Sequence, residues 1–179
     1  PDRGMVFQEY ALFPWMTVAQ NIAFGLEVQK KSRSDITQTV NQLLDLLHLK
    51  DFRDRYPKDL SGGMRQRVAI ARVLALDSPI MLMDEPFGAL DALTRRNLQD
   101  ELLRIWEKLG KTILFVTHSI EESIYLADRI VVMTYRPGTV KRDQRVDMPR
   151  PRDPSSAAFN ALKRELGALD VQMVKPGPG

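Results

Sequence analysis

The sequence predicts an α/β domain with a mainly parallel β-sheet and a helical subdomain inserted into it. Short β-rich runs alternate with amphipathic helical stretches, which is the pattern of an α/β fold. Several of the strand-like runs are continuously apolar, which indicates strands covered on both faces of a parallel sheet. About seventy residues of mainly helical pattern separate the first two strands, too many for a simple crossover, so we expect a helical insertion there.

Local patterns give the order of the elements. Strands are expected at residues 4–8, 80–84, 112–117 and 130–135. Apolar residues at helical spacing predict helices at 36–47 and 90–109, the second ending at Gly110. A third helix is expected at 62–76, and a fourth begins at Ser119, where Ser119 and Glu122 have the spacing of a capping box. The proline-rich chain from Pro137 predicts turns and extended segments with one short helix at 155–166.

These elements suggest four segments. Residues 1–8 end a strand of the core, and residues 9–78 form the helical subdomain. Residues 79–135 complete the core, and residues 136–179 form a basic, proline-rich C-terminal extension.

Composition excludes several classes of protein. The 179 residues are one ordinary domain's worth of chain and include no Cys, which excludes disulfides, thiol nucleophiles and cysteine-ligated zinc. No apolar run approaches the roughly 18 residues of a membrane-spanning helix, and the start lacks the layout of a signal peptide. Because the chain begins with Pro1 rather than Met, we expect the natural N-terminus to lie upstream.

The net charge of +3 comes from one segment. Residues 136–153 contain six basic and three acidic residues, so the rest of the chain sums to zero. A diffuse basic stretch interleaved with prolines and without stacking aromatics is a poor footprint for nucleic acid. We therefore expect a solvated surface segment here and no nucleic-acid partner.

Two adjacent carboxylates, Asp84 and Glu85, end the apolar run 80–84 and precede Pro86. Ligands of α/β sheets bind at the carboxyl ends of strands. On an extended chain the two side chains point apart, so Asp84 could hold Mg²⁺ while Glu85 orients or deprotonates a water. For the dipeptide alone, an acid pair that only caps loops or pairs with Arg is an equally good interpretation.

Ser61, Gly62 and Gly63 open the helix expected at 62–76. Backbone N–H groups at a helix start attract anions, and glycines leave room for close approach, so this stretch suits a phosphate. An N-capping Ser followed by flexible glycines is the alternative. Paired glycines weaken a helix start, which favours the ligand role.

His118 follows the strand expected at 112–117, at the same kind of strand end as the carboxylate pair. A lone His there is more often a local hydrogen-bonding group than a catalyst, but the equivalent position favours a role at the site. His48 ends an amphipathic helix and is interpreted as structural, and the two histidines do not make a zinc site.

Gln8 ends the first strand, where a neutral amide could touch a metal or a water. The loop that follows, residues 9–15, is unusually rich in aromatics. Buried core is the default explanation for these aromatics, and an exposed patch that docks a partner is the rival.

Five short motifs occur in one order along the chain: Val6-Phe7-Gln8, Leu60 to Gly63, Ile80 to Pro86, Gly88 to Asp91, and Val116 to His118. This order resembles the ATP-binding subunits of ABC transporters, from the Q-loop through the signature motif, Walker B and D-loop to the H-loop histidine. Each motif alone is weak, but five in sequence form a specific match that covers nearly the whole chain. The resemblance implies part of a P-loop NTPase core with a helical signature subdomain.

The resemblance assigns roles in ATP hydrolysis to four residues. Asp84 holds Mg²⁺, and Glu85 is the catalytic base that activates the attacking water. Gln8 senses Mg²⁺ and the γ-phosphate, and His118 is the switch histidine that contacts the γ-phosphate.

The same resemblance places other residues at a contact between two subunits. The signature residues Ser61, Gly62 and Gly63 close on ATP held by the opposite subunit, and Asp91 in the D-loop lies at the dimer interface. Met64 stands in this nucleotide-binding motif where the commonest signature has Gln. We expect that change to leave the serine hydroxyl and the backbone donors available.

Several stretches are similar to bacterial importers for nitrate, sulfonate or taurine: the run from Leu12 to Val18, the Met64 variant and the ending 148–153. Related osmolyte and polyamine importers share some of them. The resemblance implies a second ATPase subunit, a membrane permease gripped around Phe13 to Trp15 and, indirectly, a solute-binding protein. It also implies a location at the cytoplasmic face of the bacterial inner membrane.

The sequence contains no G-x-x-x-x-G-K-[ST] stretch, the phosphate loop of such ATPases, and only seven residues precede Gln8. The leading hypothesis is therefore the C-terminal part of an importer ATPase, which by itself neither binds nor hydrolyses ATP. A nucleic-acid maintenance ATPase is disfavoured, because only 53 positions separate Gln8 from Ser61 and they lack a sustained heptad. A catalytically incompetent module that docks on a permease or an intact ATPase subunit is the remaining alternative.

Overall fold

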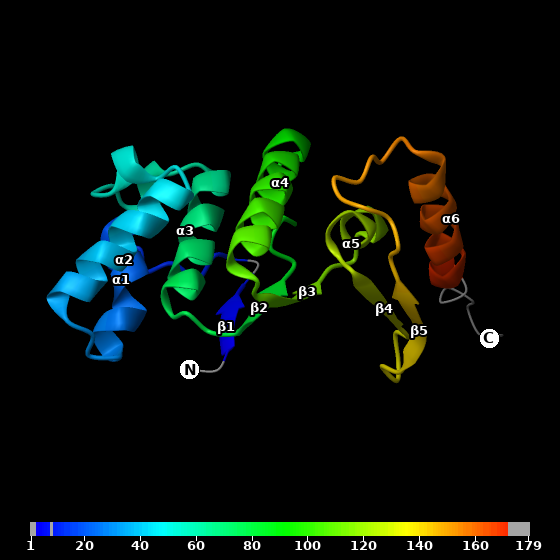
Figure 1. Cartoon of the computed structure of the whole chain (residues 1–179), viewed down its shortest axis with the longest axis horizontal. Coiled ribbons are helices and arrows are strands. Elements are labelled where there is room, and N and C mark those ends of the chain that lie inside the picture. The colour runs from blue at the N-terminus through cyan, green and yellow to red at the C-terminus, as the bar shows by residue number, and fades with distance from the viewer. Residues whose placement is uncertain (1–2, 8, 172–179) are drawn as a thin grey trace, which may run out of the picture. The chain divides into compact units, whose positions relative to one another are not determined.

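The chain forms two compact units, Pro1–Val116 and Thr117–Gly179. The computed structural model describes residues 3–7 and 9–171. Both units combine helices with strands, as the α/β prediction requires (Figure 1).

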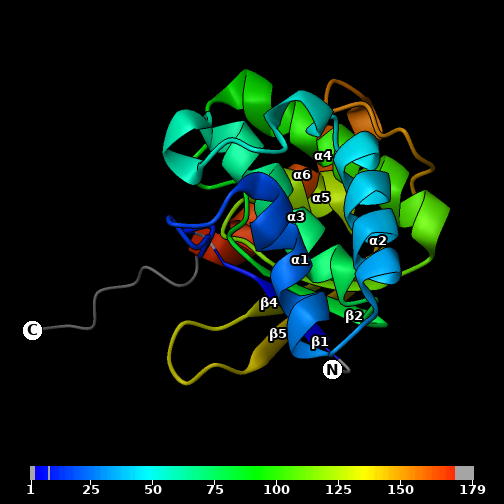
Figure 2. The same cartoon turned by 90° about the vertical axis from the view of Figure 1, so that its left-hand side faces the viewer.

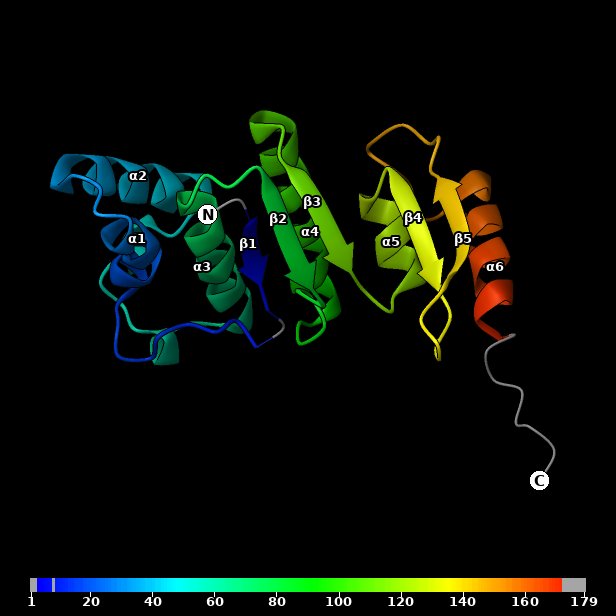
Figure 3. The same cartoon turned by 90° about the horizontal axis from the view of Figure 1, so that it is seen from below.

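A parallel sheet forms the centre of the first unit. β1 (Arg3–Val6), β2 (Ile80–Asp84) and β3 (Thr112–Val116) lie in the order β1-β2-β3, and both pairs are parallel (Figure 3). Arg3 is opposite Ile80, and Asp84 is opposite Val116. The predicted parallel sheet is confirmed, and β2 has the predicted bounds.

Helices cover one face of this sheet. Figure 3 shows α3 (Gly62–Ala75) and α4 (Ala92–Leu109) behind the strands. Val6 and Met83 on that face are buried, whereas Met5, which points to the other face, is 42% exposed. α3 approaches β1 so closely that a Cβ on Gly4 would lie 2.3 Å from Cγ1 of Val73, so this contact requires glycine.

The chain between β1 and β2 is helical, as its pattern predicts. It forms α1 (Val18–Val28), α2 (Arg33–Leu46), two short 3-10 turns (Lys50–Phe52 and Pro57–Asp59) and α3. α1 packs against α2 and α3 (Figure 2).

Short polar signals set the helix ends. The hydroxyl of Thr17 accepts from Gln20 N–H at the start of α1, and that of Ser61 accepts from Met64 N–H at the start of α3. α4 ends where Gly110 takes a left-handed conformation with φ of 59°, at the predicted position.

The second unit contains α5 (Ile120–Leu126), β4 (Arg129–Met133), β5 (Val140–Arg145) and α6 (Ala157–Val171). β4 and β5 pair antiparallel as a hairpin, coloured yellow in Figure 2. The expected strand 130–135 therefore belongs to a separate two-stranded sheet. The expectation of turns, extended segments and one helix after Pro137 did not identify β5 as a strand, because its polar sequence carries no strand pattern and pairing with β4 creates the strand.

A buried arginine organises the second unit. Arg152 is only 4% exposed, and its guanidinium donates to the carbonyl oxygens of Ile124 at 2.7 Å, Ala127 at 2.7 Å and Met148 at 3.0 Å. It also lies within 3.3 Å of the Val146 carbonyl oxygen and 3.5 Å of that of Tyr125. The expectation that 136–153 is simply a solvated surface stretch is wrong for this residue, because the last carbonyls of α5 need a donor.

Candidate functional site

The two predicted carboxylates lie at the carboxyl end of β2. Asp84 is the last residue of the strand and is exposed. Glu85 does not continue the extended chain: its φ is +46°, in the left-handed region that non-glycine residues seldom enter. The premise of an extended chain through both residues is therefore wrong, because the backbone turns at Glu85.

Hydrogen bonds hold Glu85 in this conformation. Its N–H donates to the carbonyl oxygen of Val116, the last residue of β3, at 2.9 Å. Its own carbonyl oxygen accepts from Gly88 N–H at 3.1 Å. Left-handed backbone at such a residue costs about 1–3 kcal/mol, and strain of this kind concentrates at functional sites.

A buried ring and an arginine from α4 anchor the loop after Glu85. The Phe87 side chain is fully buried, with its ring centroid 5.8 Å from that of Phe115 on β3. Arg95 on α4 donates to the carbonyl oxygens of Phe87 at 3.2 Å and Leu90 at 2.7 Å. The sequence analysis did not single out Arg95, because nothing in its local pattern distinguishes it from other arginines of the helix.

Asp91 begins α4 as its N-cap. Its carboxylate accepts from Thr94 N–H at 3.0 Å. The hydrogen bond from Thr94 lowers the pKa of Asp91. The sequence analysis placed Asp91 at a dimer interface only, and the spacing of Asp91 and Thr94 could also have predicted the cap.

The signature residues lie against the start of α4. A Cβ on Gly63 would lie 2.6 Å from Cγ2 of Thr94, and one on Gly62 would lie 3.3 Å from both Leu90 Cδ2 and the Tyr10 hydroxyl. Gly63 is buried, whereas Ser61 is exposed and already caps α3. Gly63 thus serves helix packing, while Ser61 remains at the surface, with Gly62 and Met64 half-buried beside it.

The remaining predicted residues lie elsewhere. His118 is exposed and belongs to the second unit, directly before the N-cap of α5. His48 follows α2 with φ of 54° and is exposed, as expected of a residue that ends a helix. Gln8 lies outside the described residues.

The aromatic loop is partly exposed. The Phe13 ring packs between those of Trp15 and Phe24, with centroid distances of 5.7 Å and 4.6 Å and tilted ring planes. The Arg72 guanidinium lies 4.7 Å from the Phe13 ring centroid, and burial lowers the pKa of Arg72. Trp15 itself is 69% exposed, which favours the patch over the core interpretation for this ring.

A buried amide fixes the backbone of that loop. Asn21 on α1 is fully buried; its Oδ1 accepts from Phe13 N–H at 2.9 Å, and its Nδ2 donates to the carbonyl oxygens of Phe13 at 3.1 Å and Met16 at 3.0 Å. The sequence analysis missed Asn21, which looks like any polar residue of a surface helix. The exposed Trp15 therefore lies on a rigid support.

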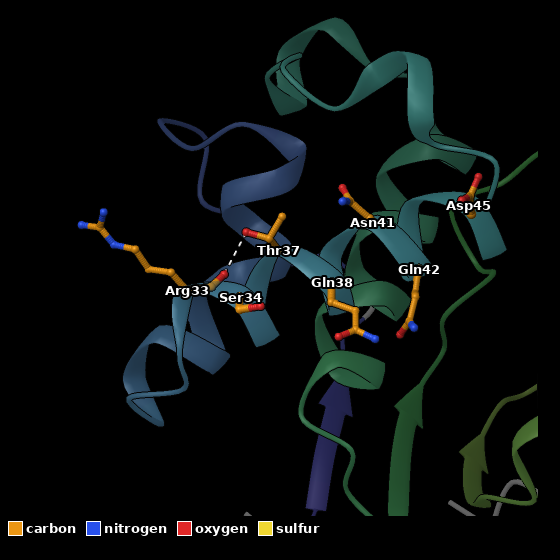
Figure 4. Close-up of a pocket in the computed structure, with 7 residues that line it drawn as sticks. All are labelled: Arg33, Ser34, Thr37, Gln38, Asn41, Gln42 and Asp45. Atoms are coloured by element: carbon orange, nitrogen blue, oxygen red, sulfur yellow. Dashed lines mark hydrogen bonds between the residues drawn. The ribbon is translucent and has the colours of Figure 1, made fainter.

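One shallow hollow is lined by seven polar residues of a single helix, α2, from Arg33 to Asp45 (Figure 4). Among residues 3–7 and 9–171, no cluster of three or more His, Cys, Asp or Glu is arranged to hold a metal ion. No helix in the same ranges combines the length and apolar character needed to cross a membrane.

Comparison with known proteins identifies the family. The model of the family described as ABC transporter matches residues 2–88. The ABC transporter ATP-binding protein MJ0412 of Methanocaldococcus jannaschii is 51% identical over 92% of this chain, and the match covers 62% of that protein. Over most of its length the chain is similar to ABC transporter ATP-binding proteins. The resemblance stated from the motifs is thereby confirmed.

ATP-binding proteins of importers are among the relatives of this chain. The nitrate import ATP-binding protein NrtD of Synechocystis is 47% identical over 92% of the chain and is covered over 62% of its own length. The taurine import ATP-binding protein TauB of Roseobacter denitrificans is 50% identical over 81% of the chain, with 54% of its length covered. The chain thus spans less than two thirds of these relatives.

Solved structures share the fold. The ATP-binding cassette MJ0796, in a dimeric post-hydrolysis state bound to ADP and Pi, superposes with a TM-score of 0.68 at 33% identity. The match covers 82% of this chain and 64% of the cassette. The predicted ABC-type α/β core is confirmed.

Proposed function

We propose that the chain carries the hydrolytic end of an ATP-hydrolysing subunit of an ABC importer, with Glu85 as the general base. The conformation of Glu85 supports this most directly. A carboxylate at the carboxyl end of a parallel strand lies where ligands of such sheets bind, and its turned backbone is held by Val116. Glu85 would accept the proton of the water that attacks the γ-phosphate.

Asp84 fits the part of a Mg²⁺ ligand. It offers exposed, hard carboxylate oxygens at the end of β2, and Mg²⁺ in nucleotide sites needs only one or two protein ligands besides phosphates and waters. Gln8 would add an amide oxygen. Bound Mg²⁺ neutralises charge on the phosphates.

The signature residues support a role for a second subunit. Ser61 is at the surface at the start of α3, where the helix dipole favours an anion. We infer that Ser61, Gly62, Gly63 and Met64 close on ATP held by a partner ATPase subunit, with Asp91 at that interface. The dimers of the MJ0796 cassette agree with this arrangement. His118 would contact the γ-phosphate.

The names of the relatives suggest the transported class. Nitrate, aliphatic sulfonates and taurine, the solutes in those names, are small oxyanions or carry a sulfonate. We propose that the importer takes up such a solute, delivered by a solute-binding protein. The exposed Trp15, on the loop held by Asn21 and Arg72, would dock the permease at the cytoplasmic face of the inner membrane.

Glu85→Gln in the complete gene product tests the proposed base. It keeps the size and hydrogen-bonding capacity of the side chain but cannot take the proton, so kcat should fall by at least about 10²-fold. ATP-bound dimers should persist on size-exclusion chromatography. Glu107→Gln, at an exposed position of α4, should leave turnover unchanged. Undiminished turnover by Glu85→Gln would exclude Glu85 as the base.

A docking module without catalysis is the second candidate, favoured by the exposed Trp15 on its rigid loop. It predicts that the chain binds the permease while the unsubstituted protein shows no Mg²⁺-dependent ATP turnover. Turnover by the unsubstituted complete gene product would decide for the enzyme.

A further inference from the structure

Three residues form a closed set of hydrogen bonds around the backbone of His118. The Thr117 hydroxyl donates to Oε2 of Glu122 at 2.8 Å and accepts from Ser119 N–H at 3.0 Å. The Ser119 hydroxyl accepts in turn from Glu122 N–H at 3.2 Å. Both neighbours of His118 in the chain are therefore tied to the first turn of α5.

This arrangement is a capping box with a hydroxyl inserted into it. In an ordinary box the side chain three residues after the cap accepts directly from the N–H of the cap residue. Here the Ser119 N–H donates to Thr117, and Thr117 passes the bond on to Glu122. The local spacing of Ser119 and Glu122 predicts the box, whereas the part of Thr117 emerges only from the structure.

Burial differs sharply between this box and the ring that it surrounds. Glu122 is 8% exposed, and Thr117 and Ser119 are half-buried, whereas His118 is exposed. The direction of an exposed ring depends strongly on the backbone that carries it. The box fixes that backbone on both sides.

We propose that the Thr117 hydroxyl, held by Glu122, is a positioning group for His118. The hydroxyl thereby sets the orientation of the imidazole on the three-residue link between β3 and α5. The inference rests on the proposed function in one respect: the box affects ATP turnover only because His118 contacts the γ-phosphate. A misplacement of about 1 Å in such a group costs up to about 10²-fold in rate.

Thr117→Val tests the positioning role, because it keeps the shape of the side chain and removes the hydroxyl. In the complete gene product, kcat should fall by about tenfold or more, while KM for ATP changes less than about twofold. Thr117→Ser restores the hydroxyl and should recover kcat to within about twofold. Thr37→Val is the matched control, since the hydroxyl of the exposed Thr37 donates to the Arg33 carbonyl oxygen within α2.

Histidine NMR gives a readout that does not need ATP turnover. The chain has two histidines, so His48 serves as an internal reference for folding. Thr117→Val should shift and broaden the ring signals of His118 and leave those of His48 unchanged. Thr117→Ser should return the His118 signals to their original positions.

The outcomes separate the two proposals. Unchanged His118 signals and unchanged kcat in folded Thr117→Val would overturn the positioning role. If Thr117→Val alters the His118 signals but the parent protein has no ATP turnover, the positioning role stands and the proposed function is overturned. If Thr117→Val fails to fold, Glu122→Met is the second variant, because it removes the acceptor of the Thr117 hydroxyl and should give the same changes. Glu122→Gln keeps an acceptor, so its His118 signals and kcat should stay close to those of the parent. Parent-like His118 signals in Glu122→Met would then overturn the proposal.

Discussion

The two units satisfy their buried polar backbone by different means. In the first unit, parallel strands pair with one another, and apolar side chains such as Met83 and Leu98 fill the space between sheet and helices. In the second unit, the carbonyls at the end of α5 accept from guanidinium groups instead: Arg152, which is buried, donates to Ile124 and Ala127, and Arg150 donates to Leu126. A small unit with one hairpin has few apolar side chains to spare, so one ion with many hydrogen bonds takes on much of the organisation.

Electrostatics confirms how closely the second unit surrounds this ion. Burial lowers the pKa of Arg152, the neighbouring Arg150 lowers it further, and Asp128 acts in the opposite direction. Arg150 pairs with Asp128 at 2.6 Å. The second unit therefore depends on the guanidinium of Arg152, which lies within hydrogen-bond distance of five carbonyl oxygens.

Removing that guanidinium should have the largest effect on stability. Arg152→Met keeps most of the side-chain volume but leaves up to five carbonyl oxygens without their donor, so we expect a loss of about 3–5 kcal/mol. Hydrogen exchange should accelerate first in α5 and around 146–148. Arg164→Met, at an exposed position of α6, should change stability by less than about 0.5 kcal/mol. An equally small loss of stability in Arg152→Met would show that Arg152 does not organise the second unit.

A cavity in the first unit should cost somewhat less. Leu98 on α4 is 1% exposed, and Leu98→Ala removes its apolar contacts, for an expected loss of about 3 kcal/mol in urea unfolding. Leu93 on the same helix is 73% exposed, so Leu93→Ala should be nearly neutral. If hydrogen exchange in the Leu98 variant accelerated in α5 rather than in α3 and α4, Leu98 would not stabilise the first unit as proposed.

Overpacking should disturb the first unit by a smaller amount. Gly4→Ala drives a methyl group against Val73 of α3, and we expect a loss of about 1–3 kcal/mol. Val73→Ala in the same chain should recover part of that loss, so the double variant measures the coupling between β1 and α3. Gly138→Ala, with nothing within 4 Å of the new Cβ, is the control. Simple addition of the two single effects would contradict a direct contact.

The smallest expected effect concerns pH. The pKa of Asp91 is lowered in the folded protein, so its contribution to stability is complete above the ordinary Asp value and is lost as pH falls through the lowered one. Asp91→Asn keeps a capping oxygen without a charge. It should match the parent near pH 7 and lose less stability than the parent as pH falls below about 4, measured by urea midpoints. If the urea midpoints of the two proteins fell equally with pH, Asp91 would not contribute to the loss of stability in acid.

Much of the fold followed from local pattern. α4 was expected at residues 90–109 and occupies Ala92–Leu109, because its apolar spacing, its capping residues and Gly110 all act within a few positions. α2 and α3 follow from the same kind of signal. β5 did not, because its alternation of polar residues carries no apolar face and its pairing partner is β4.

The candidate site divides in the same way. Residue types and their order were sufficient to propose Asp84, Glu85, Ser61 and His118 as candidates, because chemistry fixes which side chains can hold a metal, take a proton or cap a helix. The family comparison confirmed the resemblance that this order carries.

The sequence by itself thus determined the fold class, the bounds of α3 and α4 to within two residues, and the resemblance to ABC ATP-binding proteins, since these depend on periodicity and on motifs of a few residues. Only the tertiary structure decided that the chain turns at Glu85, that Thr117 enters the capping box and that Arg152 is buried. The physical reason is distance along the chain. Val116 lies 31 residues after Glu85, and Arg152 lies 28 residues after Ile124, so no local pattern records contacts that exist only once the strands and helices have packed.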